Sequence, residues 1–147
     1  MSGNSNYWIN MADMKIRHVS RMLYPRCQCR GFKGECKYGL EMHHMISCGV
    51  MHFRHDLRNI IVLCANHHRL STLLSPHGNP KAFNEWMDKE RRDHWAWVEA
   101  NKWKGGKKNY KEAYDRLVGF EELLKNGMRP ERILVAIFKK EEVEDEG

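Results

Sequence analysis

Histidines and cysteines are crowded into one stretch of the chain, and this crowding constrains the fold more than any other feature. Seven of the nine histidines fall between residues 43 and 77: His43, His44, His52, His55, His67, His68 and His77. The five cysteines are Cys27, Cys29, Cys36, Cys48 and Cys64. An odd number of cysteines without a secretory signal argues against a disulfide framework. Because imidazole and thiolate are ligands that hold transition metals, this stretch is predicted to fold around bound metal.

Length and composition are typical of a basic protein with one domain. The chain has 147 residues, of which 41% are hydrophobic and 30% charged. No apolar run is long enough to cross a bilayer, so we expect a cytoplasmic protein with no membrane partner. The formal net charge of +6 includes five acidic residues near the C-terminus, so the remainder carries about +11 (6 plus 5). Such a charge favours a polyanionic partner such as nucleic acid, although a generically basic soluble protein would show it too.

The spacing of apolar residues predicts helices around a small sheet. Helical spacing covers residues 7–24, 81–101, 110–124 and 130–138, and a shorter helix is expected over residues 65–74. Residues 40–46 and the apolar run Ile60-Ile61-Val62-Leu63 are predicted strands. The order is therefore strand, loop, strand and helix, with further helices on both sides. This order predicts an α+β fold.

The most informative segment runs from residue 40 to residue 68. It places the pair His43-His44 at the end of a predicted strand, Asn59 after a loop, and His68 in the predicted short helix. This pattern resembles the HNH endonuclease superfamily, whose fold is the small ββα-metal (His-Me finger) unit. The stretch from Met51 to Ile60 and the later Gly78-Asn79 are similar to the NinG/Rap type of phage recombination nuclease. The resemblance covers residues 27–80 and leaves the later helices unexplained.

The resemblance implies roles for four residues of the motif. In HNH nucleases the first histidine of the pair ligates a divalent cation and the second is the general base. We therefore expect His43 to bind Mg²⁺, Mn²⁺, Ni²⁺ or Zn²⁺ and His44 to deprotonate water. His68 is the expected second ligand, and Asn59 the brace that keeps the base-bearing strand in register. Because neighbouring residues of a strand point to opposite faces, a twist or bulge is needed to bring both histidines near one phosphate.

Many HNH nucleases also hold a structural zinc ion with two Cys-x-x-Cys pairs, and this sequence departs from that pattern. Cys64 is followed by His67 instead of a second cysteine, and only one residue separates Cys27 from Cys29. We expect a Cys₃His zinc site made of Cys29, Cys64 and His67, with either Cys27 or Cys36 as the fourth ligand. The alternative is that these cysteines are simply buried thiols.

Basic residues around the motif are expected to contact DNA. Arg54, Arg58 and Arg69 are the expected phosphate contacts. His77 is expected to be an extra metal ligand or phosphate contact, with an ordinary loop residue as the alternative. Residues 102–108 interleave a tryptophan with lysines and glycines, which suits either a DNA-binding segment or a solvated linker.

These interpretations divide the chain into four segments and lead to one expected function. The segments are an N-terminal helical or extended part (1–26), the ββα-metal core (27–80), C-terminal helices (81–140) and an acidic tail (141–147). We expect a metal-dependent HNH endonuclease that hydrolyses DNA phosphodiester bonds, with branched recombination substrates suggested by the NinG-like resemblance. Two alternatives are a zinc-stabilised nucleic-acid-binding module without catalysis and an RNase on the same scaffold. The His43-His44 pair favours catalysis, because a binding module needs no proton acceptor beside a metal ligand. The oligomeric state stays open, a homodimer included.

Overall fold

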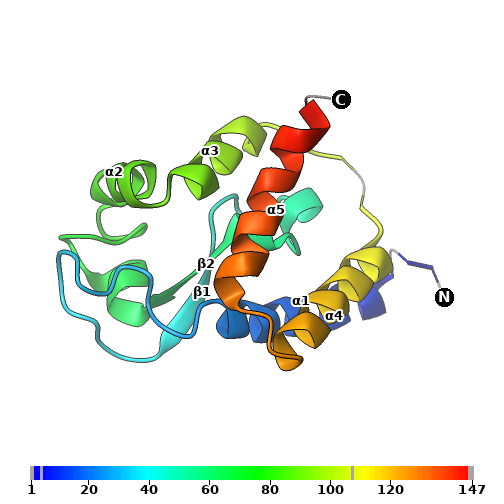
Figure 1. Ribbon diagram of the computed structural model, residues 1–147. Helices are drawn as coiled ribbons and strands as arrows, with labels where there is room; N and C mark the ends of the chain where they lie inside the picture. Colours follow the sequence, from blue (N-terminus) through cyan, green and yellow to red (C-terminus); the bar gives the residue numbers. More distant parts are fainter. Residues whose placement is uncertain (1, 4, 107, 146–147) are drawn as a thin grey trace.

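The computed structural model, which describes residues 2–3, 5–106 and 108–145, places helices around one two-stranded sheet (Figure 1). The elements are α1 (Asn6–Leu23), β1 (Leu40–His44), β2 (Ile60–Cys64), α2 (Pro80–Glu90), α3 (Arg92–Asn101), α4 (Tyr110–Lys125) and α5 (Pro130–Asp145). The short turns η1 (Met51–Phe53) and η2 (Leu57–Asn59) precede β2, and η3 (Asn66–Leu70) follows it. Helices and a small antiparallel sheet thus share one fold, as predicted.

The two strands pair in a register that sets the direction of the histidine pair. Antiparallel partners run from Leu40 opposite Cys64 to His44 opposite Ile60, and His43 lies opposite Ile61. A twist or a bulge was expected to bring His43 and His44 together; the partners are consecutive, so this ladder has no bulge between them. Side chains alternate along a strand, and the two histidines therefore point to opposite faces of the sheet.

Both faces of β2 are buried, which explains why this strand is a continuous apolar run. Ile60 and Val62 pack toward α1, α4 and α5, in a cluster that includes Ile16, Val19, Leu117 and Ile133. Ile61 and Leu63 pack toward α2, in a second cluster that includes Phe83, Trp86 and Met87. Figure 1 shows α1 and α4 side by side below the sheet and α2 on its other side. His43 therefore shares the α2 face, and His44 the α1 face.

The prediction of one continuous helix over residues 81–101 is wrong, because the chain leaves helical geometry at Arg91 and forms two helices. This residue leaves helical geometry, with φ −134° and ψ 55°, between α2 and α3. Its guanidinium lies 5.2 Å from the Trp86 ring centroid and donates to Gln28 Oε1 at 3.2 Å. The break redirects α3 so that Trp97 and Val98 join a third buried cluster with Ile46 and Phe53.

The short helix predicted over residues 65–74 is a single wide turn, η3. The Ser71 N–H donates to the Asn66 carbonyl at 2.7 Å, five residues back. The chain then folds onto this turn, and a Cβ atom at Gly78 would stand 2.1 Å from the Ser71 carbonyl oxygen. Glycine is therefore required at this close approach. The loop places His77 beside η3, where its N–H donates to the His68 carbonyl at 3.3 Å.

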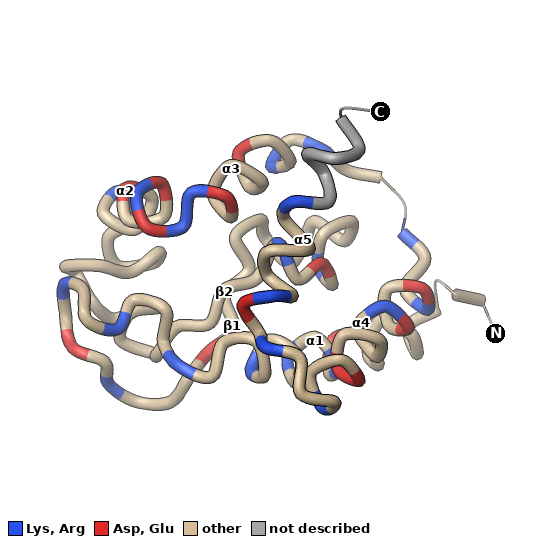
Figure 2. The backbone as a smooth tube through the Cα atoms, viewed as in Figure 1, with Lys and Arg blue, Asp and Glu red and all other residues tan. Residues whose placement is uncertain are grey.

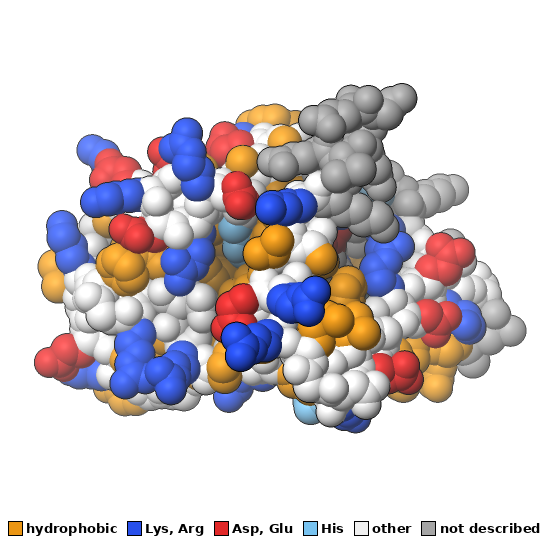
Figure 3. Space-filling model, viewed as in Figure 1, with side chains coloured by type: hydrophobic (Ala, Val, Ile, Leu, Met, Phe, Trp, Pro, Cys, Tyr) orange, Lys and Arg blue, Asp and Glu red, His pale blue; other side chains and the backbone are white. Residues whose placement is uncertain are grey.

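Charged residues are distributed over the whole molecule. Figure 2 shows lysines and arginines on most elements, interspersed with acidic residues. Figure 3 shows basic side chains gathered over the loop between α1 and β1, where Arg26, Arg30, Lys33 and Lys37 are exposed. Helix α5 continues through Asp145 and takes in part of the predicted acidic tail, while residues 146–147 lie outside the described part. None of the described helices is long and apolar enough to cross a membrane.

Candidate functional site

Four of the predicted zinc ligands come together. The ligand atoms of Cys27, Cys36, Cys64 and His67 all lie within 4.8 Å of one another. The Nδ1 atom of His67 is 3.3 Å from Cys64 Sγ, 3.5 Å from Cys27 Sγ and 3.6 Å from Cys36 Sγ. A tetrahedral zinc ion places its nitrogen and sulfur ligands about 3.6 Å apart. The Cys₃His group could therefore hold a structural zinc ion.

Hydrogen bonds prepare two of these residues to be ligands. The Nε2–H of His67 donates to the Lys33 carbonyl at 2.9 Å, which leaves the Nδ1 lone pair directed at the sulfurs. Burial raises the pKa of the Cys64 thiol, but hydrogen bonds from the backbone N–H groups of His67 and Lys37 outweigh it and lower that pKa to about 7. Cys64 is thus ready to become the thiolate that a metal ion requires.

Cys29 lies outside this group, and the expectation that it is a zinc ligand is corrected. It is fully buried in the cluster that contains Ile61 and Leu63, and this burial raises the pKa of its thiol. Cys36 joins the group because the loop turns back at Gly31 and Gly34, whose φ values are 88° and 87°. The structure thus selects both Cys27 and Cys36, where the sequence predicted only one of them.

A second group consists of three histidines. The ligand atoms of His43, His68 and His77 lie within 4.8 Å of one another, and they come from β1, η3 and the loop before α2. His43 Nδ1 is 3.2 Å from His68 Nε2. Two nitrogen ligands of one ion are about 3.0 Å apart in octahedral and about 3.4 Å apart in tetrahedral geometry. His77 is exposed, with its ring centroid 4.9 Å from that of His68. The spacing therefore fits a cation with an open side.

A carboxylate orients this group. Glu41 Oε1 accepts from the Nδ1–H of His68 at 2.8 Å, so the Nε2 lone pair of His68 faces His43. Hydrogen bonds from Arg69 and His68 lower the pKa of Glu41, which stays ionised. The sequence prediction missed Glu41, although its position two residues before His43 on one strand is a signal for a shared face.

His43 itself is held in the neutral form that a ligand needs. Burial, followed by the neighbouring His68, His77 and His44, lowers the pKa of His43 to about 3.

His44 stands apart from the cation group, at the end of β1. Its Nε2 atom is 3.0 Å from the carbonyl oxygen of Arg54. A carbonyl oxygen only accepts, so Nε2 carries the proton and Nδ1 is left as the acceptor. Burial lowers the pKa of His44 and outweighs the hydrogen bond to Arg54, which raises it. The ring is therefore neutral at cellular pH, with one nitrogen able to take a proton.

Asn59 ties the loop to the end of β1. Its side chain is fully buried, and its Oδ1 accepts from the Ile46 N–H at 2.6 Å. Its Nδ2 donates to the carbonyls of Ile46 at 2.9 Å and Phe53 at 3.2 Å. These three bonds fix the chain directly after the histidine pair.

Each arginine predicted to contact phosphate is paired with a carboxylate. Arg54 binds Asp13 with two bonds of 2.8 Å, and Arg69 Nε donates to Glu41 at 3.1 Å. Arg58 Nη2 donates to Asp56 at 2.8 Å. Each would have to share or leave its carboxylate to bind a phosphate.

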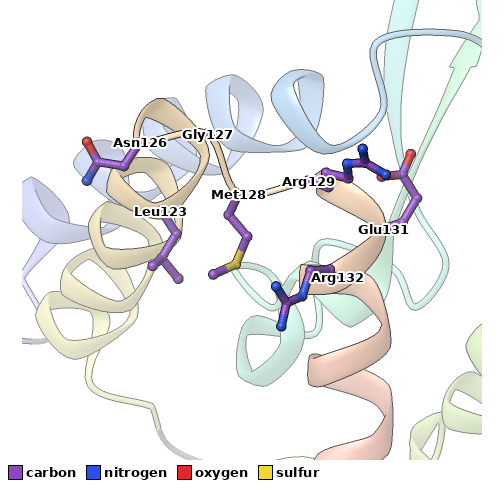
Figure 4. A pocket seen from close by; sticks show the side chains of 7 residues that line it. All are labelled: Leu123, Asn126, Gly127, Met128, Arg129, Glu131 and Arg132. Carbon is purple, nitrogen blue, oxygen red and sulfur yellow. The ribbon is translucent and has the colours of Figure 1, made fainter.

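A groove leads away from the histidine group. It encloses about 530 Å³, and its lining includes His43, Phe83, Trp95 and, directly after α3, Lys102. A larger hollow of about 1060 Å³ lies at the turn between α4 and α5, where the side chains of Leu123, Met128 and Arg132 point toward one another (Figure 4). Neither histidine nor cysteine lines that larger hollow, so the groove at His43 is the candidate substrate site.

Comparisons with known proteins give no further guidance. No protein-family model, curated protein or solved structure matches the chain.

Proposed function

We propose that the chain is a metal-dependent endonuclease of the HNH type that hydrolyses phosphodiester bonds in DNA. The observation that carries the proposal is the convergence of His43, His68 and His77 at the strand β1, which also carries His44, a neutral histidine whose Nδ1 is an available acceptor. The order β1, loop, β2 and η3 supports the proposal of a ββα-metal unit in which the single turn η3 takes the place of the helix. Action on branched recombination intermediates, as in NinG-like nucleases, belongs to the same proposal.

In the proposed chemistry, the histidines at one face of β1 bind the cation and His44 on the other face accepts a proton. A divalent cation held by His43, His68 and His77 would neutralise charge on the phosphate and on the departing 3′ oxygen. His44 Nδ1 accepts the proton of the attacking water, while its Nε2–H stays on the Arg54 carbonyl. Because His43 and His44 point to opposite faces, the phosphate must bind beyond the end of the strand, within reach of both rings.

The ligand set favours some cations over others. Imidazole nitrogens suit Zn²⁺, Ni²⁺ and related transition metals, whereas Mg²⁺ prefers oxygen ligands. Three histidines are the ligands grouped here, and Glu41 is engaged with His68 and Arg69. We therefore expect activity with Ni²⁺ or Zn²⁺ to exceed activity with Mg²⁺.

The groove supplies a path for the nucleic acid beside the cation group. Trp95 is partly exposed and offers a ring on which a base can stack. Lys102 lines the same groove and pairs with Glu99 at 2.9 Å, so it would have to share that carboxylate to bind a phosphate. The net charge of +6 favours attraction to a polyanion at long range.

A second candidate function is a zinc-stabilised nucleic-acid-binding module without catalysis. The Cys₃His group favours it, because a structural zinc ion stabilises a fold whether or not the protein cleaves its ligand. The two candidates differ in the need for His44, since only a nuclease requires its acceptor nitrogen.

The test is nicking of supercoiled plasmid by the full chain with Mg²⁺, Mn²⁺, Ni²⁺ or Zn²⁺, with and without EDTA. His18→Ala is the matched control, because His18 is an exposed histidine on α1 outside both groups. We expect metal-dependent nicking by the wild type and by His18→Ala but not by His44→Ala. Competition among duplex, single-stranded, branched DNA and RNA substrates identifies the nucleic acid. Binding of DNA without cleavage under every condition would leave the binding module as the function.

A further inference from the structure

We infer that Asp13 on α1 is the positioning residue for His44, an inference that rests on the role of His44 in the proposed function. Asp13 makes no hydrogen bond to His44. It acts through Arg54, whose backbone carbonyl accepts the Nε2–H of His44 at 3.0 Å. The orientation of that carbonyl decides which nitrogen of His44 carries the proton, and hence which nitrogen is free to accept one.

The contact between Asp13 and Arg54 fixes orientation as well as distance. Arg54 Nε donates to Asp13 Oδ1 and Arg54 Nη2 to Asp13 Oδ2, both at 2.8 Å. Two parallel charge-assisted bonds hold the planar guanidinium in one plane. Because the side chain and the carbonyl belong to the same residue, this pairing limits rotation of the peptide that His44 contacts.

Asp13 also holds the next residue of the loop. The side chain of His55 is only 2% exposed, and its Nε2–H donates to Asp13 Oδ1 at 2.6 Å. On the other side, Asn59 Nδ2 donates to the carbonyl of Phe53 at 3.2 Å. The side chain of Asp13 thus holds Arg54 and His55, and the side chain of Asn59 holds Phe53, the residue before them.

The packing of helix α1 against the sheet fixes the position of Asp13. Ile16 and Val19, on the same helix, are buried against Ile60 and Val62 of β2, the strand that pairs with His44. The chain of contacts therefore runs from β2 through α1 and Asp13 to the loop, and back to His44. Between the strands, the loop itself has only the short turns η1 and η2. Without Asp13, the loop would keep the Asn59 bond to Phe53 and backbone bonds such as that from the Arg54 N–H to the Met51 carbonyl at 3.3 Å, but it would lose the bonds that tie Arg54 and His55 to α1.

The test compares Asp13→Asn with Glu121→Gln in the zinc-loaded full chain. Glu121→Gln is the matched control, because Glu121 forms an ion pair of the same kind with Lys15 on α1, at 3.0 Å, but has no bond to the loop at His44. The first readout is the ¹⁵N NMR signals of the two ring nitrogens of His44, which report the tautomer directly. The second is plasmid nicking, measured together with affinity for DNA.

We expect His44 to be the Nε2–H tautomer in the wild type and in Glu121→Gln, and a mixture of tautomers in Asp13→Asn. We expect the nicking rate of Asp13→Asn to fall about tenfold to a hundredfold, the range seen when a partner that orients an active-site group is removed. Affinity for DNA should stay unchanged. Asp13→Glu should recover part of the rate.

An unchanged Nε2–H tautomer in Asp13→Asn would overturn the inference, whatever the nicking rate. If Asp13→Asn does not fold, Arg54→Lys takes its place, since it keeps the charge and loses the second hydrogen bond. Absence of nicking by the wild type would count against the proposed nuclease, while the NMR comparison would still decide the role of Asp13. The two failures are therefore distinguishable.

Discussion

His43 Nδ1 lies 3.2 Å from His68 Nε2, although 25 residues separate the two histidines in sequence. The Nδ1–H of His68 donates a hydrogen bond to Glu41, so its Nε2 presents a lone pair to His43. Two lone pairs at this distance repel each other unless a proton or a cation lies between them. In the metal-free protein a proton on His43 Nδ1 can fill this place. We propose that a divalent cation fills it in the active protein.

The first prediction concerns Glu41, which orients His68. Replacing Glu41 with glutamine removes the charge that fixes the His68 tautomer and its ring. We expect affinity for the cation at the histidine group to fall about tenfold to a hundredfold, as for other partners of metal ligands. Titration with Ni²⁺ or Zn²⁺, followed by calorimetry, measures this change.

Glu122→Gln is the control for Glu41→Gln, because Glu122 is exposed on α4 and away from the histidines. It should leave cation affinity unchanged. Equal affinities in wild type and Glu41→Gln would show that Glu41 does not orient a metal ligand.

The second prediction concerns the Cys₃His group. Cys36→Ser removes one ligand, and we expect the zinc content to fall by one ion per chain. A ligand present at a thousand times its Kd stabilises a fold by about 4 kcal/mol. For a chain of this size that corresponds to a drop of about 10 °C in Tm.

Cys48→Ser and Cys29→Ser separate ligation from the mere loss of a thiol. Cys48 is exposed and Cys29 is buried, and both lie outside the group. Both variants should retain the zinc ion, as determined by atomic emission. Loss of zinc in Cys29→Ser but not in Cys36→Ser would restore the ligand set expected from sequence.

Local patterns in the sequence predicted most of the elements, because these depend on residues close together in the chain. The apolar run at Ile60 predicted β2, and the spacing after Tyr110 predicted α4. The break at Arg91 was not predictable from spacing, because it depends on contacts with Gln28 and Trp86.

The candidate site shows the same division. Spacing identified His43 and His68 but placed Cys29 among the zinc ligands, because it does not show where the loop turns back at Gly31 and Gly34. No pattern in the sequence pointed to Asp13, because its partners Arg54 and His55 lie more than 40 residues away in sequence.

The third prediction concerns Asn59, which ties the end of β1 to the loop. Asn59→Ala leaves the buried N–H and carbonyl of Ile46 without their partners. We expect a loss of about 2–4 kcal/mol in the free energy of unfolding, since each unsatisfied buried group costs about 1–3 kcal/mol. Urea unfolding measures it, and Asn126→Ala, an exposed position after α4, is the control. A loss below about 0.5 kcal/mol, the usual size for surface changes, would contradict the proposed brace.

The fourth prediction is a dependence of stability on pH that arises from His94. Burial lowers the pKa of His94 to about 4, against 6.5 for the exposed side chain. The folded state therefore favours neutral His94. Its contribution is complete above pH 6.5 and is lost as the pH falls toward 4.

Between pH 7 and pH 5 this loss amounts to about 2 kcal/mol by proton linkage. Urea unfolding of the zinc-loaded wild type and of His94→Leu at both pH values isolates it. We expect the variant to lose about 2 kcal/mol less than the wild type over this interval. Equal losses in the two proteins would mean that His94 does not carry the effect.

The most direct test of the central claim measures cation content and plasmid nicking in the same samples of wild type, His44→Ala and His68→Ala. We predict two transition-metal ions per chain and nicking for the wild type. His44→Ala should hold two ions without nicking, and His68→Ala one ion without nicking. Nicking by His44→Ala at the wild-type rate, or a single ion in the wild type that persists in His68→Ala, would contradict a histidine-bound cation working beside His44.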